Sequence, residues 1–534
     1  MAGKLFVTKP LSLLLEEMAG ENRLRRVLGP LQLSALGVGA IVGTGIFVLT
    51  GEAAHDRTGP ALMLSFVVAG FACVFAALCY AEFASMVPVA GSAYTYAYAT
   101  LGELFAWIIG WDLVLEYAIG SSTVAHGWSA HFQEFIPLLN LHIPKHLSSG
   151  PFDYLPATGQ FVRTGSYLDL PAILITFSVT VVLVKGIRES ASFNAVMVAI
   201  KLCIVLLVIG VGAFYINPAN WHPFAPFGYT GVNFFGHHLL GKMSAGGEPL
   251  GMFAGAAIIF FAYIGFDSVS VHSEEARNPA RDVPIGIITS LIVCTVLYIA
   301  VSAVLTGMVP TSEIDRNAAF VIAFKRVGLT WMQYLVAAGA MTGITSVLLV
   351  MMLSQPRVLL AMGRDGLVPN SFFGAIHPRF RTPWKSTILT GIFVAVMAGF
   401  LPLSILAEMT NIGTLFAFVI VCGAVMVMRK TNPDAKRPFR APLVPLVPIL
   451  GILTCLLLMF SLPAGNWYRL IIWLLIGFAI YFLYGRQHSV MARYRHLEHE
   501  IAAHGTGAPA VGDPDAPPSS QAAPIDTTIK EPLE

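Results

Sequence analysis

Apolar runs long enough to cross a bilayer recur along this chain, and they constrain its fold more strongly than any short motif. A membrane-spanning helix needs roughly 20 predominantly apolar residues, and about twelve such runs follow one another here. Only 12% of the residues are charged, whereas a soluble domain usually carries about 25%. We therefore predict an all-α polytopic membrane protein with twelve transmembrane helices. The expected spans lie near residues 31–50, 61–84, 95–125, 168–185, 192–214, 251–272, 284–308, 331–362, 384–400, 403–428, 443–462 and 466–484.

The distribution of basic residues predicts how the chain crosses the membrane. If the chain crosses the membrane at every expected span, most of its 32 Lys and Arg residues lie in segments on the same side of the membrane. This asymmetry exists although the net charge is only +2. Basic loops accumulate in the cytoplasm, and an even number of spans then puts both termini there. Residues 1–30 have the pattern of an amphipathic surface helix, and the tail at 487–534 is expected to be mostly disordered. The small net charge gives no reason to expect nucleic acid as a partner.

Two loops on the opposite side are long, at 126–167 and 215–250, and they are rich in Pro, Gly and aromatic residues. We expect them to form short helices or lids over an outer vestibule.

Stretches that resemble enzyme or metal-site motifs do not have the residue spacing that those motifs require. The histidines of "HEIAAH" lie five residues apart, at His499 and His504, whereas a zinc protease needs four. The stretch "GVGAIVG", Gly37 to Gly43, is one residue too long for a dinucleotide-binding loop and follows no expected strand. All 6 cysteines fall within expected spans, where cysteine behaves as a small apolar residue. We therefore expect no enzyme activity, no cofactor and no metal site.

The first expected span contains the stretch "GAIVGTGIFV", which is unusual for a continuous helix. Gly39 and Gly43 form a Gly-x-x-x-Gly pair, so close helix packing is one explanation. The other explanation is an interruption of the helix at Val42 to Gly45, which is tolerated in a membrane only where it is buried in protein or lines a cavity. The second half-helix would then present free N–H groups that suit a carboxylate, and the first would present carbonyls that suit an ammonium group.

A second interruption is expected at the head of the second set of five spans, in "FAGAAIIFFAYIGFDSVS". There Gly265 follows Ile264, and Asp267 is well placed to cap a new helix N-terminus. Paired breaks that head two halves of a chain are typical of the binding site of a secondary transporter. Free carbonyls and free N–H groups together would form a cradle for an α-amino acid zwitterion.

Four stretches of this chain resemble the bacterial relatives of the cationic amino acid transporters, in the amino acid-polyamine-organocation (APC) superfamily. They are "RRVLGPLQLSALGVGAIVGTGIFVLTG", "PVAGSAYTYAYATLGE", "FFAYIGFDSVSVHSEEARNPARDVPIGI" and "SQPRVLLAMGRDGLVP". The resemblance implies a LeuT-like fold within a transporter domain at 31–486. That fold has two inverted repeats of five spans, here about 31–214 and 251–428, followed by spans 11 and 12 at about 443–484. The bacterial relatives imply an inner (plasma) membrane location.

The resemblance also implies which backbone groups bind substrate. The N–H groups of Gly43, Thr44 and Gly45 would bind its carboxylate. The carbonyls of Ile41, Phe261, Ala262 and Ile264 would bind its amine.

Lys201 lies about eleven residues into the fifth expected span, hence about 16 Å deep at the helical rise. It either snorkels toward the headgroups or is a functional group, because an ionisable residue inside a membrane is expensive. A desolvated lysine releases and takes up a proton more readily than an exposed one. Proton-coupled members of the superfamily carry a lysine at this place, so the resemblance implies proton coupling through Lys201.

Glu116 in the third expected span lies one helical turn beyond Asp112 and shares its face. Two such carboxylates repel unless one is protonated or paired. In the resembled family a glutamate in this "LEY" context faces the central cavity, which implies a place in a proton path or a contact with the substrate amine. The alternative, a glutamate satisfied by helix–helix hydrogen bonds, stays open.

We interpret the chain as a secondary active amino acid permease that takes up L-amino acids by alternating access, coupled to protons. An exchanger of amino acids or amines is the alternative, and a membrane amino acid sensor is a more remote one. Neutral and cationic substrates remain equally open. The expected partners are the substrate, protons and the lipid bilayer, and a small single-span membrane protein is compatible with this fold.

Overall fold

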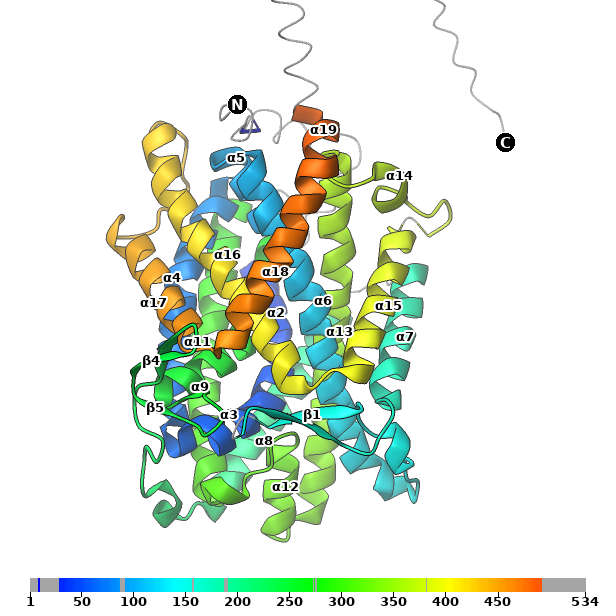
Figure 1. Ribbon diagram of the computed structural model, residues 1–534, viewed down its shortest axis with the longest axis vertical. Helices are drawn as coiled ribbons and strands as arrows, with labels where there is room; N and C mark the ends of the chain where they lie inside the picture. Colours follow the sequence, from blue (N-terminus) through cyan, green and yellow to red (C-terminus); the bar gives the residue numbers. More distant parts are fainter. Residues whose placement is uncertain are drawn as a thin grey trace, which may run out of the picture.

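The computed structural model describes residues 8–9, 28–86, 92–155, 158–186, 191–271, 273, 276–380 and 382–491. Within these ranges the chain forms a bundle of long helices that run side by side (Figure 1). Most of the expected amphipathic segment at 1–30, and the tail from residue 492 onward, lie outside the described residues.

Within the described ranges, eight helical stretches are long and apolar enough to span a membrane. They are Gly45–Met86, Glu103–Leu139, Val196–Tyr215, Met252–Ser270, Pro279–Met308, Thr330–Arg364, Leu403–Thr431 and Ala464–His488. The shorter apolar helices are Pro30–Ile41, Leu170–Lys185, Trp384–Phe400 and Leu446–Phe460. Together these segments overlap every expected span, so the all-α polytopic prediction is confirmed, while the count of twelve crossings stays a prediction.

The helices have the following bounds. They are α2 (Pro30–Ile41), α3 (Thr50–Ala53), α4 (Leu62–Met86), α5 (Ser92–Thr100), α6 (Glu103–Phe135), α7 (Leu170–Lys185), α8 (Ala191–Gly212), α9 (Met252–Ile259), α10 (Ser268–Val271), α11 (Pro279–Met308), α12 (Ala319–Arg326), α13 (Thr330–Arg364), α14 (Asn370–Phe373), α15 (Trp384–Phe400), α16 (Leu403–Thr431), α17 (Leu446–Phe460), α18 (Ala464–Ile480) and α19 (Arg486–His488).

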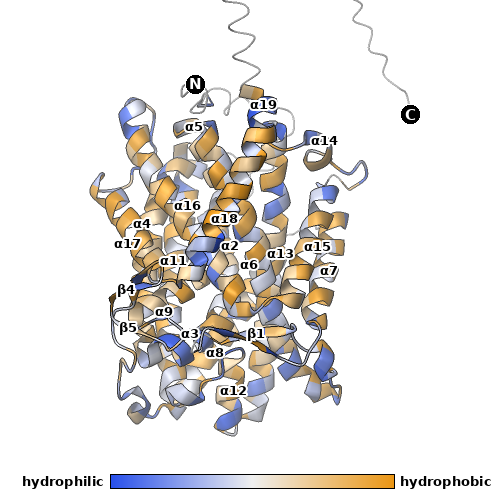
Figure 2. Cartoon of the chain, viewed as in Figure 1, coloured by the Kyte–Doolittle hydropathy of each residue, from blue (hydrophilic) through white to orange (hydrophobic). Residues whose placement is uncertain are grey.

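The long helices of the bundle consist largely of hydrophobic residues (Figure 2). Large apolar side chains such as Leu475 and Ile472 on α18 are exposed, as expected for helices that face lipid. Inside the bundle, α6 packs along α13 and α16, while α11 packs along α2 and α4. The broken helices described below lie among these central elements.

The expected third span at 95–125 is wrong in its boundaries. Two helices occupy this region, because Gly102 has a φ of 97° and ends the helical path between α5 and α6. Helix α6 then begins at Glu103 and continues to Phe135, ten residues beyond the expected end.

The two long loops contain more regular structure than the expected short helices. In the first, β1 (Phe152–Leu155) pairs antiparallel with β2 (Gln160–Arg163). In the second, β3 (Val232–Phe234) pairs with β4 (His237–Leu240), and β5 (Lys242–Met243) with β6 (Pro249–Leu250). The labelled strands β1, β4 and β5 lie in the same half of the bundle as α12, and the end on this side is here called the strand end (Figure 1). The opposite end, which carries α5, α14 and α19, is called the terminus end.

Candidate functional site

The first helix is interrupted where the glycine-rich stretch predicts it. Helix α2 ends at Ile41, and Val42 has extended backbone angles with φ −74° and ψ 103°. The helical path resumes in a π-helical turn, Gly45–Leu49, and continues into α3. All of these residues are buried, so irregular backbone lies inside the protein, as a membrane requires.

The second interruption lies at the expected place as well. Helix α9 passes into a 3-10 turn, Phe260–Tyr263, after which Ile264 is extended and Gly265 has a φ of 120°. Asp267 directly precedes α10, and its carboxylate accepts a hydrogen bond from the Tyr117 hydroxyl at 2.8 Å. The same carboxylate faces the backbone N–H groups of Gly265 and Ser268, which agrees with a capping role.

The two breaks lie directly against each other. A Cβ atom on Gly45 would lie 2.6 Å from Ala262 Cβ, and one on Gly265 would lie 2.9 Å from the carbonyl oxygen of Ala40. Each break therefore uses a glycine to approach the backbone of the other. The packing explanation, which the sequence offered only for Gly39 and Gly43, extends to Gly45.

A tyrosine that the sequence analysis missed bridges the two breaks. The Tyr298 hydroxyl of α11 lies 3.0 Å from the Ile41 carbonyl oxygen and 2.9 Å from that of Ala262. One hydroxyl proton can serve only one of the two carbonyls at a time. The signal was a tyrosine inside an apolar run, because a buried tyrosine usually finds a partner for its hydroxyl.

Lys201 lies on the first break rather than at a membrane surface. Its side chain is 0% exposed, so the snorkelling alternative is wrong. The Nζ atom donates to the carbonyl oxygen of Gly39 at 2.5 Å, and the stem passes Gly343 of α13. A continuous helix would direct the N–H of Gly43 at this carbonyl, so the break makes it accessible to the lysine.

The seven residues expected to bind substrate are all buried, and the hydrophobic ones among them are at most 4% exposed. The structure brings Ile41, Gly45 and Ala262 into direct neighbourhood through the contacts above. The Thr44 hydroxyl is buried and has no hydrogen-bond partner among the described residues. Glu116 lies farther along α6, where Thr414 of α16 interacts with its carboxylate.

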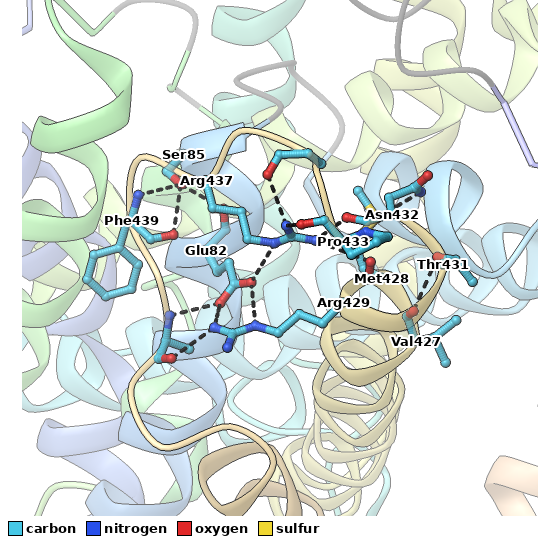
Figure 3. A network of polar contacts seen from close by, with 12 residues as sticks. Glu82, Ser85, Val427, Met428, Arg429, Thr431, Asn432, Pro433, Arg437 and Phe439 are labelled. Carbon is cyan, nitrogen blue, oxygen red and sulfur yellow. Dashed lines mark hydrogen bonds and ion pairs between the residues drawn. The ribbon is translucent and has the colours of Figure 1, made fainter.

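Two ionic networks, which the sequence analysis also missed, lie toward the two ends of the bundle. At the strand end, Arg57 pairs with Glu248 and with Glu408, the latter at 3.4 Å. At the terminus end, the Glu82 carboxylate of α4 accepts bonds from Arg429 at 2.6 and 3.0 Å (Figure 3). Arg437 approaches the same carboxylate at 3.4 Å, so α4 is joined to the segment that follows α16.

A family model described as amino acid permease matches residues 28–482. The chain belongs to the amino acid permease family. The permease is 46% identical to the branched-chain amino acid permease BcaP of Bacillus subtilis, over 92% of this chain and 99% of that protein. It is 45% identical to the methylthioribose transporter of the same organism, over 91% of this chain and 99% of that protein. It is 38% identical to the vacuolar cationic amino acid transporter 4 of Arabidopsis thaliana, over 78% of this chain and 65% of that protein.

These comparisons confirm the resemblance to the APC superfamily. The permease is a multi-pass membrane protein that transports amino acids, and its fold is LeuT-like. Its relatives are named as permeases and transporters, which agrees with the absence of enzyme signatures in the sequence.

Proposed function

We propose that this permease couples the uptake of L-amino acids to protons by alternating access. The observation that supports the proposal most is the position of Lys201, whose Nζ atom contacts the first break through the Gly39 carbonyl. No carboxylate of the described residues forms an ion pair with this lysine. A buried lysine without a counter-charge is stable as the neutral amine, and a proton that it gains adds a charge beside the substrate site.

In this proposal the two breaks bind the charged groups that all α-amino acids share. The N–H groups of Gly43, Thr44 and Gly45 bind the carboxylate, since they begin the second half-helix. The carbonyls of Ile41, Phe261, Ala262 and Ile264 bind the amine. Tyr298 contacts two of those four carbonyls, so it would yield one of them to the substrate amine or share it.

The protonation of Lys201 can act on the first break because the two groups share one hydrogen bond. The charged ammonium group holds the Gly39 carbonyl more strongly than a neutral amine does. Loss of the proton would weaken the tie between α8 and α2 next to the substrate site. Proton release and a change in the position of the first half-helix would then occur together.

Transport driven by a pH gradient is the direct test. The purified permease in proteoliposomes without internal substrate should accumulate a labelled amino acid when the outside is more acidic. The lumen should acidify at the same time, with a fixed number of protons entering per amino acid. An exchanger would need internal substrate and would leave the lumenal pH unchanged. A sensor would bind amino acid and transport none in either condition.

We propose neutral, branched-chain amino acids as the substrate class. The relative named as a branched-chain permease aligns over nearly its whole length, whereas the one named as a cationic transporter is less identical and aligns over 65% of its length. Competition uptake with leucine, isoleucine, valine, arginine and lysine tests this choice. Inhibition by arginine at least as strong as by leucine would assign a cationic substrate.

The topology completes the proposal. We propose twelve spans at 31–486, both termini in the cytoplasm and a bacterial plasma membrane location, because the basic residues of the terminus end obey the positive-inside rule. Labelling of single cysteines introduced at exposed Asp434 and Asp153 would distinguish the two sides. Co-purification from the membrane would test the predicted small single-span partner.

A further inference from the structure

The contact between α6 and α16 carries a polar pair that the proposed transport cycle has not yet used. Asp112 and Glu116 project from α6 one helical turn apart, so they lie on the same face. On α16, Gly413 faces Asp112, since a Cβ atom on this glycine would lie 3.0 Å from Asp112 Oδ1. Thr414 faces Glu116. Both carboxyl groups therefore point into the same helix–helix contact.

Asp112 is 1% exposed, and neither of its side-chain oxygens has a hydrogen-bond partner among the described residues. Glu116 is 2% exposed, and its Oε1 atom likewise has no partner there. No ion pair of the described residues involves either group. An isolated carboxylate in an apolar interior is far less stable than the neutral acid, so the pair favours bound protons over negative charge.

Within the part of the chain that the structure describes, no compensating cation pairs with either carboxyl group. Helix α6 packs on α5, α7, α13, α15, α16 and α18. Among the described residues of these elements, no charged side chain interacts with Asp112, and Glu116 is the carboxyl group next to it on α6 itself. Asp267 of the second break accepts a hydrogen bond from Tyr117, the residue next to Glu116 on α6. Glu116 therefore lies between the substrate site and Asp112.

We propose that Asp112 is a second proton-binding site of the permease and takes the proton that Glu116 releases toward the terminus end. This inference rests on the proposed proton coupling. Asp112 lies nine residues into α6, about 14 Å from its first residue at 1.5 Å per residue. Because Glu116 lies four residues deeper, Asp112 separates it from the end that we assign to the cytoplasm.

The proton transfer balances in two steps. Asp112 first loses the proton of its O–H group to the terminus end and becomes a carboxylate. The Glu116 O–H bond then breaks while a new O–H bond forms on Asp112, and the negative charge moves to Glu116. The pair never holds two negative charges at once, which removes the repulsion that two adjacent carboxylates would cause.

The first test replaces the acid by its neutral, equally sized amide. The Asp112→Asn variant should keep counterflow exchange within about twofold of the unchanged permease but lose about tenfold or more of pH-gradient-driven accumulation, since a proton relay has lost its acid. The matched control is Asp434→Asn, the same change at an exposed position, which should keep both activities. If Asp112→Asn retains full gradient-driven accumulation, the proposal is wrong.

A second pair of measurements covers the case in which Asp112→Asn loses both activities. Asp112→Glu should then restore gradient-driven uptake in part, whereas no gain over the amide variant would assign a purely structural role. In the unchanged protein, a hydrophobic carbodiimide should label Asp112, because this reagent modifies protonated carboxyl groups in apolar sites. No label on Asp112 across pH 5 to 8 would contradict a bound proton.

These readouts separate the two proposals. If the unchanged permease shows no pH-gradient-driven uptake, the proposed function fails, whatever Asp112 does. If the permease is proton-driven and Asp112→Asn behaves like Asp434→Asn, only the role of Asp112 fails. Loss of lysine or arginine transport alone in Asp112→Asn would instead assign Asp112 to a cationic substrate.

Discussion

Among the described residues, Arg57 and Lys201 are the two cations with at most 1% exposure, and their surroundings are opposite. Arg57 is 1% exposed and contacts Glu248 and Glu408 as well as the Pro249 carbonyl, which lies 2.9 Å from it. Lys201 is 0% exposed and donates to one carbonyl, that of Gly39. A guanidinium group keeps its proton at any physiological pH, so its burial requires neutralising partners. A lysine can become neutral instead, and no described residue provides a counter-charge to Lys201.

This difference separates a structural cation from one that can change its charge. The partners of Arg57 come from distant parts of the chain, because Glu248 precedes β6 and Glu408 lies on α16. Asn466 of α18 donates to the second Glu408 oxygen at 3.0 Å. The second half of the first helix, which ends near Arg57, is thereby fixed to the strand end. Lys201 contacts the first half of the same helix through one hydrogen bond.

The largest expected effect follows from removing the structural cation. Arg57→Met removes the cation that two buried carboxylates share and should destabilise the fold by about 3–5 kcal/mol, which is typical of a broken buried ion pair. Thermal unfolding in detergent measures the loss. The matched variant Arg57→Met/Glu248→Gln/Glu408→Gln removes the stranded charges and should recover most of the stability. If the single variant unfolds like the unchanged protein, the comparison of the two cations loses its basis.

Lys201→Ala should have the reverse profile. We expect pH-gradient-driven uptake to fall about 100-fold or more, because the exchangeable proton is lost, while the melting temperature changes less than in Arg57→Met. Lys201→Arg is the control, since it keeps the charge but cannot release the proton under physiological conditions. It should keep binding and fail in gradient-driven uptake. Gradient-driven uptake that survives in both variants would remove Lys201 from the coupling step.

Gly45→Ala tests whether the first break tolerates any change next to Lys201. The added methyl group would overlap Ala262 of the second break, and such overpacking costs about 1–3 kcal/mol. Gly423→Ala on α16 is the matched control, because its methyl group would meet nothing within 4 Å. If the Gly45 N–H group contacts the carboxylate, Gly45→Ala should weaken the affinity for substrate by more than the loss of folding stability explains. Equal binding in both variants would leave Gly45 a packing residue only.

The sequence was sufficient for most of the helices and for both breaks, for one physical reason. In lipid each helix satisfies its own backbone, so apolar runs and the glycines that interrupt them carry the information locally. Arg57 shows the limit, because its partners lie 191 and 351 residues away and no local pattern relates them. Tyr298 shows another limit, since inside an apolar run a bridging tyrosine looks like a packing residue. The hairpins of the long loops also depend on pairing between segments.

The smallest expected effect concerns Tyr154, whose hydroxyl on β1 donates to Glu248 and extends the Arg57 network to the first long loop. Burial, followed by the bond to Glu248, raises the pKa of Tyr154 above its ordinary value, so the hydroxyl stays a neutral donor. A raised pKa means that this contribution is complete below the ordinary tyrosine value of about 10 and is lost only at higher pH.

Tyr154→Phe should therefore cost about 1 kcal/mol, the typical value of one net hydrogen bond, and the cost should be equal at pH 6 and pH 8. Melting temperatures of the two proteins at both pH values measure it. Tyr167→Phe, at an exposed position beyond the hairpin, is the control and should leave stability unchanged. If the cost disappeared at pH 8, the Tyr154 hydroxyl would titrate there. Its contact with Glu248 would then depend on pH, which the permanent charge of Arg57 argues against.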